Sequence, residues 1–295
     1  MKHISKIILI ITAICVSLGL LITIVAVAAG GAGIAKEIVL GKHFPSLYVN
    51  TNRANDEFGI YFGNVSTKEN SVGWSAETIK NLDLKYEAGL VEIVEGDDDV
   101  TVKVIYRGKN SVSLEGDKLI INSTNKEIIN GKGTVRLEVP KGFAFDNVKM
   151  QVGAAQVDIG MLRAKNFELE LGAGAACIDN IACDNMNIHI AAGEVFLEDA
   201  HVENAYVDVG MGNLEYEGIV SKDLDVNCGM GNVFFEIKDR EEIQNNYKVE
   251  CGAGNVTVGD SSYSGLATVR NITNENASAD YVLKCGMGNI EIAFE

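Results

Sequence analysis

Seven side chains in the second half of the chain have the types and the regular spacing that ligand binding or catalysis would need. Glu170, His189 and Asp208 are evenly spaced along the chain, so a repeat of that length would stack them. Stacked carboxylates with basic residues nearby would suit an enzyme that acts on acidic polysaccharides, whereas a solvated sheet face is the simpler alternative. The candidate binding stripe comprises Glu168, Glu170, His189, Tyr206, Asp208, Asp225 and Glu250.

Other patterns of site chemistry point away from an enzyme. The four histidines lack the spacing of metal ligands, and no cysteine pair has the spacing of a zinc site. No glycine-rich loop opens a helix that would cradle a phosphate. Arg163, Arg240 and Arg270 are scattered in connecting segments, where they would not grip one substrate together. We therefore expect no catalytic residue, no cofactor and no metal ion.

The elements that must position the stripe belong to a short repeat that contains the phrase Gly-x-Gly-Asn or a close variant. Its first small residue falls at positions 153, 172, 191, 210, 229, 252 and 286. The first four gaps between these positions are equal, whereas the last two are longer and contain insertions. A fixed period near twenty residues is typical of a solenoid, whose units bury their apolar faces by stacking on one another.

Within each unit the apolar residues alternate with period two, which indicates strands. Val207 and Val209 are expected to point inward, and Tyr206 and Asp208 outward. The inward positions resume after the turn at Val157, Val195, Leu214, Val233, Val256 and Ile290. We also expect the middle residue of each turn to point inward, namely Ala154, Ala173, Ala192, Met211, Met230, Ala253 and Met287.

The Gly-Asn pairs after these turns are expected to supply positive φ angles at a corner. The fold class that follows is all-β: a single-stranded, right-handed β-solenoid (β-helix) with coils of about 19 residues. Residues 82–93 fit as a degenerate first repeat. Because the chain ends directly after the last turn, the insertion at 259–280 is expected either to cover the open end or to leave it free for edge-to-edge self-association.

Cysteine positions follow the same repeat. Cys228, Cys251 and Cys285 occupy one position before the glycine, where we expect a stack of reduced, inward-pointing thiols. Cys177 and Cys183 are the better candidates for exposure.

The N-terminal region contains an apolar run without charges at residues 7–35, which is long enough to cross a bilayer. A cleaved signal peptide ending near Ala28 is the alternative. Lys2 and Lys6 precede the run, so the positive-inside rule places the N-terminus in the cytoplasm and the rest outside. The expected organisation is a cytoplasmic tail (1–6), a transmembrane anchor (7–35), a juxtamembrane spacer (36–75) and the repeat domain (76–295).

A formal charge of −16 argues against nucleic acid and anionic lipid surfaces as partners.

The Gly-x-Gly-Asn phrase behind a membrane segment, together with Ile79-Lys-Asn-Leu-Asp-Leu84 and Ala88-Gly-Leu-Val-Glu-Ile93, resembles the bacterial "putative adhesin" β-strand-repeat family of unknown function. The resemblance implies an extracytoplasmic β-solenoid, without catalytic residues to carry over, and some relatives are linked to cell-envelope stress. We therefore expect a non-catalytic, single-pass binding or scaffolding protein at the cell envelope, with an envelope polymer or protein as partner. The alternatives are a carbohydrate-active enzyme on the same fold and a self-assembling surface protein.

Overall fold

The computed structural model describes residues 47–50, 59–62, 69–108, 110–123, 133–265 and 267–295. The chain forms two compact units, Met1–Asn64 and Val65–Glu295. In the first unit, β1 (Leu47–Asn50) pairs antiparallel with β2 (Gly59–Phe62). The predicted anchor at residues 7–35 lies outside the described residues. Within the described part of the chain, no helix has the length and apolar character needed to span a membrane.

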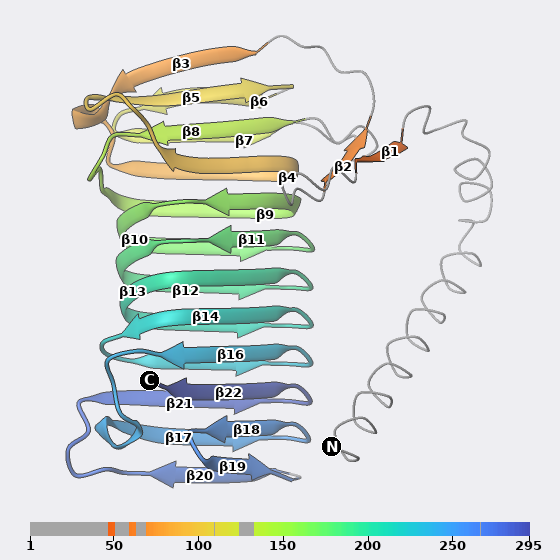
Figure 1. The fold of residues 1–295 in the computed structure, drawn as a ribbon, viewed down its shortest axis with the longest axis vertical. Coiled ribbons are helices and arrows are strands. Elements are labelled where there is room, and N and C mark those ends of the chain that lie inside the picture. The colour runs from red at the N-terminus through yellow and green to blue at the C-terminus, as the bar shows by residue number, and fades with distance from the viewer. Residues whose placement is uncertain (1–46, 51–58, 63–68, 109, 124–132, 266) are drawn as a thin grey trace. The chain divides into compact units, whose positions relative to one another are not determined.

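The second unit is a stack of β-coils, which Figure 1 shows as successive rungs. Its middle coils comprise β9 (Phe145–Ile159), β10 (Leu162–Leu171), β11 (Ala175–Ile178), β12 (Ile181–Ile190), β13 (Glu194–Val209), β14 (Asn213–Val220), β15 (Leu224–Cys228) and β16 (Asn232–Ile237). Neighbouring coils pair in parallel, and Glu170 is the register partner of His189, one period further on. The all-β solenoid predicted from the repeat is confirmed, and the described residues contain no α-helix.

Each coil has two main strand runs, one on either side of the Gly-x-Gly turn. Face A is made of the runs before the turns, residues 147–152, 166–171, 185–190, 204–209, 224–228, 281–285 and 247–251. Face B is made of the runs after the turns, residues 156–159, 175–178, 194–197, 213–216, 232–235, 289–292 and 255–258. The apolar core lies between the two faces, and the predicted inward residues Val207 and Val233 are buried in it.

The turns themselves differ from the sequence prediction. Met211, Met230 and Met287 are 61%, 54% and 66% exposed, so the middle residue of the turn points to solvent and not into the core. The alanines at the same position, Ala154, Ala173, Ala192 and Ala253, are exposed as well. The chain bends over the first glycine and the middle residue, and this bend shifts the alternation so that the second glycine faces inward.

The Gly-Asn pairs do not form the predicted positive-φ corners. None of the pairs that begin at Gly212, Gly231, Gly254 and Gly288 has a positive φ. Glycine is required by close packing instead: a Cβ atom at Gly231 would lie 1.9 Å from the carbonyl oxygen of Gly212 in the preceding coil.

The N-terminal end of the stack begins with β4 (Asn81–Glu95), which pairs in parallel with β9 along most of its length. This confirms the degenerate first repeat. On its other side β4 pairs with β7 (Lys118–Ser123) and β8 (Thr134–Val139). Antiparallel strands then close both faces, as β6 (Asn110–Glu115) pairs with β7, and β5 (Thr101–Arg107) joins β8 to β3 (Asn70–Ser75). A 3-10 turn, η2 (Ala76–Thr78), connects β3 to β4.

The C-terminal coils are stacked out of sequence order, as Figure 1 shows. The last coil, β21 (Ala279–Cys285) and β22 (Asn289–Phe294), lies between the coil of β15 and β16 and the coil of β17 (Asn245–Cys251) and β18 (Asn255–Val258). The expectation that the chain ends at the open edge is therefore wrong.

Strands from the insertion form the terminal rung. β20 (Thr268–Ile272) pairs antiparallel with β17, and β19 (Ser261–Ser264) pairs antiparallel with β18. The insertion therefore covers the coil of β17 and β18 with strands, as one of the two sequence alternatives proposed. A second 3-10 turn, η4 (Glu242–Gln244), precedes β17.

The described cysteines are all free thiols. Cys228, Cys251 and Cys285 are buried in one stack, in the register order Cys228, Cys285, Cys251. Cys177 is exposed as predicted, whereas Cys183 is only 7% exposed because it points into the core.

Candidate functional site

The parallel register places the whole candidate binding stripe on the outer side of face A. Glu170, His189 and Asp208 are consecutive partners in one row, as their even spacing in the sequence predicts. Glu168 and Tyr206 stand in the neighbouring row, in which Asn187 separates them. The remaining members are Asp225, next to Tyr206, and Glu250, which follows Lys284 in the first row.

A lysine neutralises the acidic end of this stripe, and an amide of the same face donates a hydrogen bond to it. The Nζ atom of Lys149 lies 2.6 Å from Oε1 of Glu168 and 3.2 Å from Oε1 of Glu170. Gln151 Nε2 donates a hydrogen bond of 2.9 Å to the other oxygen of Glu170. This bond and the lysine hold the pKa of Glu170 below its usual value, and the bond to Glu168 raises the pKa of Lys149.

Most of the other stripe residues are also paired within the face. His189 Nδ1 lies 3.6 Å from an Asp208 carboxylate oxygen, and its ring lies 5.5 Å from that of Tyr206, centroid to centroid. Lys248 Nζ lies 2.7 Å from Glu250 Oε1, and this contact lowers the pKa of Glu250. One oxygen of Asp225 is buried and has no hydrogen-bond partner among the described residues. Most of the stripe's charges are therefore satisfied without a ligand.

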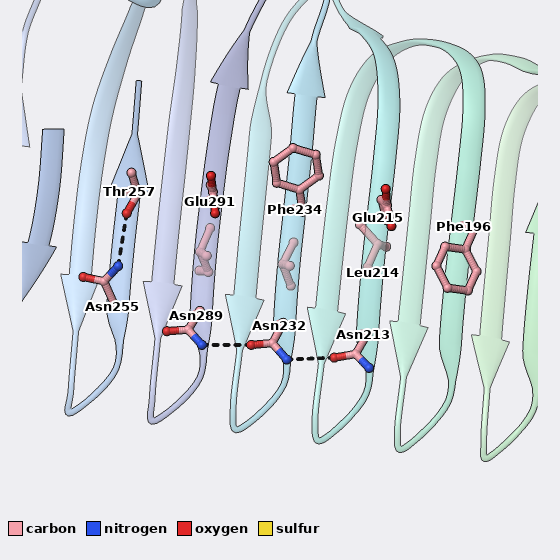
Figure 2. Close-up of a pocket in the computed structure, with 12 residues that line it drawn as sticks. Phe196, Asn213, Leu214, Glu215, Asn232, Phe234, Asn255, Thr257, Asn289 and Glu291 are labelled. Atoms are coloured by element: carbon pink, nitrogen blue, oxygen red, sulfur yellow. Dashed lines mark hydrogen bonds between the residues drawn. The ribbon is translucent and has the colours of Figure 1, made fainter. Parts of the chain in front are cut away.

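Face B contains a groove that the sequence reasoning missed. It has a volume of about 380 Å³ and spans the coils from β13 to β18. Phe196, Glu215, Phe234 and Glu291 follow one another as register partners along its floor, and Thr257 ends the row. Figure 2 shows the two phenyl rings alternating with the two carboxylates on the outer side of the strands.

A second row, made of asparagine side chains, runs beside the first. Asn289 Nδ2 donates to Asn232 Oδ1 at 2.8 Å, and Asn232 Nδ2 donates to Asn213 Oδ1 at 2.9 Å, as the dashed lines in Figure 2 mark. Asn213 Nδ2 in turn donates to Glu194 at 3.2 Å. The asparagine of the repeated phrase therefore joins neighbouring coils through its side chain.

The carboxylates of this groove differ from those of face A. Neither Glu215 nor Glu291 forms an ion pair or a side-chain hydrogen bond with a described residue. Phe196 is 39% exposed, although phenyl rings usually gain stability from burial. The signal was present in the sequence, since Phe196 and Phe234 are two periods apart and each stands between two inward residues. The exposed ring of Phe196 and the half-buried ring of Phe234, beside unpaired carboxylates, could hold a cationic or amphipathic ligand.

The capped stack of β-coils makes this a β-solenoid protein, and the sequence places it in a family. The Toastrack DUF4097 family model matches residues 79–284, so the chain belongs to that family, which confirms the resemblance to the "putative adhesin" group. No curated protein matches the chain.

Solved structures with similar folds share little sequence with the chain. A "putative adhesin" from Bacteroides fragilis NCTC 9343 has 11% identity and a TM-score of 0.45, covering 77% of this chain and 98% of that one. One from Parabacteroides distasonis ATCC 8503 has 14% identity and a TM-score of 0.45, with coverages of 76% and 97%. A "putative lipid binding protein" from the same strain has 10% identity and a TM-score of 0.32, with coverages of 76% and 97%.

Proposed function

We propose that this protein is a non-catalytic binding or scaffolding protein of the bacterial cell envelope, in the manner of an adhesin. The observation that carries the proposal is the floor of the face B groove, where Phe196 and Phe234 alternate with the unpaired Glu215 and Glu291 over four neighbouring coils. A rigid β-stack holds these groups at fixed spacing, so a ligand would meet a preformed surface. The partner would be an envelope polymer or protein, and the family resemblance adds a link to envelope stress.

The two alternative functions have less support. The face A carboxylates Glu168 and Glu170 are held by Lys149, which leaves them poorly placed for proton transfer. Self-assembly would have to use the terminal strands, and such edges commonly pair with other strands. Edge-to-edge association through these strands would be a secondary property of the binding protein.

The proposed location is the cell membrane, with residues 7–35 as an uncleaved single-pass anchor, the N-terminus in the cytoplasm and a right-handed solenoid outside. Support comes from the uncharged apolar run and from Lys2 and Lys6 before it. Protease added to intact cells should remove the repeat domain and leave a small membrane-bound fragment. Recovery of the domain in the medium, beginning near Ala28, would show a cleaved signal instead.

A pull-down from solubilised cell envelope with the full chain tests the binding function. We expect the wild-type chain to retain an envelope component, and the Phe234→Ala variant to retain much less of it. Glu168→Gln on face A is the matched control and should bind like the wild type. Equal retention by wild-type and Phe234→Ala chains, or loss only in the Glu168→Gln variant, would overturn the assignment to face B.

A further inference from the structure

We propose that the face B groove binds an extended, proline-rich peptide segment in the polyproline II conformation, with a basic residue at every third position. The inference rests on the proposed binding function and names the ligand class of that site. It follows from the charge, the spacing and the hydrogen-bonding groups of the groove.

Charge complementarity requires a cationic ligand. Glu215 and Glu291 are the ionisable residues that line the groove, and neither has a cationic partner among the described residues. The face A carboxylates Glu168, Glu170 and Glu250 each have a lysine within ion-pair distance. A lysine or arginine of the ligand would supply the missing charge at face B, with its aliphatic stem or guanidinium plane against a neighbouring phenyl ring.

The spacing of the groove matches one peptide conformation. Neighbouring coils lie about 4.8 Å apart, so Phe196 and Phe234, with Glu215 between them, are separated by about 9.6 Å along the stack. Glu215 and Glu291 have the same separation, with Phe234 between them. A polyproline II helix presents the same face every three residues, or about 9.3 Å. A β-strand presents the same face at about 6.7 or 13 Å, so it would lose register with the rings.

The hydrogen-bonding groups of the groove suit this conformation as well. Asn213, Asn232 and Asn289 each donate one side-chain N–H along their row. A second N–H of each amide remains, because the group has two. A polyproline II segment has no internal hydrogen bonds, so its carbonyl groups are free to accept these donors. Aromatic grooves that take proline-rich segments use the same combination of ring stacking and carbonyl recognition.

Binding of fluorescent peptides to the full chain in detergent micelles tests the proposal. The probe is (Pro-Pro-Arg)5, with (Gly-Ser-Arg)5 as a flexible peptide of equal charge and (Pro-Pro-Glu)5 as an acidic one. The first should bind at least roughly tenfold more tightly than either control. Phe234→Ala and the double variant Glu215→Gln, Glu291→Gln should each weaken it roughly fivefold to tenfold. Glu168→Gln on face A should change it little, and thermal melting checks that all variants are folded.

Several results would contradict the inference. Equal binding of (Pro-Pro-Arg)5 and (Gly-Ser-Arg)5 would mean that the net charge of −16 attracts any cation without a defined groove. Unchanged binding in the face B variants would place the peptide elsewhere. Failure of all peptides, with envelope polysaccharide still retained through Phe234, would overturn the peptide inference and leave the proposed binding function intact. Loss of both kinds of binding would overturn the two together.

Discussion

At the residue scale, the backbone of the neighbouring coil leaves no room for a side chain at Gly231, the second glycine of its turn. A Cβ atom at Gly231 would lie 1.9 Å from the Gly212 carbonyl oxygen and 2.9 Å from the Val209 side chain. Because the Gly212 carbonyl oxygen accepts the Asn232 N–H at 3.1 Å and cannot move without breaking this bond, Gly231→Ala should lower the free energy of unfolding by about 2–3 kcal/mol. Urea denaturation of the full chain measures the loss.

The neighbouring Met230 supplies the matched control. Its side chain is 54% exposed, so Met230→Asp should change the free energy of unfolding by no more than about 0.5 kcal/mol. If the aspartate variant loses several kcal/mol while Gly231→Ala is neutral, the inward and outward positions of the turn have been exchanged.

The pH dependence of stability contains a contribution from Glu170. The hydrogen bond from Gln151 and the contact with Lys149 lower its pKa in the folded state. A carboxyl group with a lowered folded pKa stabilises the fold above its unfolded pKa, and this contribution is lost as pH falls through the folded pKa. The melting temperature of Glu170→Gln should therefore fall less than that of the wild type between pH 7 and pH 3. An unchanged acid dependence would show that this contact adds no stability.

The burial of side chains on the strands could be predicted from the sequence, whereas their burial in the turns could not. Val207 and Val233 are buried because strict alternation holds within each run. At Met230 the chain bends, so alternation cannot be continued through it. The role of Gly231 was invisible as well, because a glycine needed for close packing looks the same in sequence as one needed for positive φ.

At the scale of elements, a ladder of asparagines joins the coils at the start of face A. Asn185 donates to Asn166 at 2.9 Å and accepts from Asn204 at 3.0 Å. Asn185→Ala removes both bonds at an exposed site and should cost about 1 kcal/mol in the free energy of unfolding. Asn187 on the same strand has a side-chain oxygen without a partner among the described residues, so Asn187→Ala should be nearly neutral. Equal losses in the two variants would mean that the ladder adds no specific stability.

The order of the last coils gives a second prediction at this scale. Lys284 is the register partner of both Asn227 and Glu250, which are therefore two coils apart. In a Cys177→Ser background, a short thiol cross-linker should join cysteines placed at 227 and 284, about 4.8 Å apart, but not those at 227 and 250. Mass spectrometry identifies which pair of peptides is cross-linked. The reverse pattern would restore the sequential order.

That order could not be predicted from the sequence. The repeated phrase at Cys228, Cys251 and Cys285 makes the three coils equivalent as neighbours. The insertions in the last two gaps of the repeat are long enough to let the chain skip a position and return. The period did predict the register of the middle coils. Their gaps are equal and contain no insertions, so each residue pairs with the one a full period further on.

At the scale of the whole unit, the solenoid has two faces that differ in how far their charges are paired, and antiparallel strands cover both of its ends. Antiparallel strands β3 and β6 finish one end, and β19 and β20 finish the other. Face A was identified from the sequence because charged residues at an even spacing are conspicuous, but its charges mostly satisfy one another. Face B was missed because outward phenylalanines look like core residues until the register is known.

Hydroxyl-radical footprinting of the full chain, with and without solubilised envelope material, tests most directly whether the protein binds through face B. We predict that bound material lowers the modification of Phe196 and Phe234, while Met211 and Met230 at the exposed turns are modified as before. Protection of Tyr206 and His189 on face A, with both phenylalanines modified as in the free protein, would contradict the account.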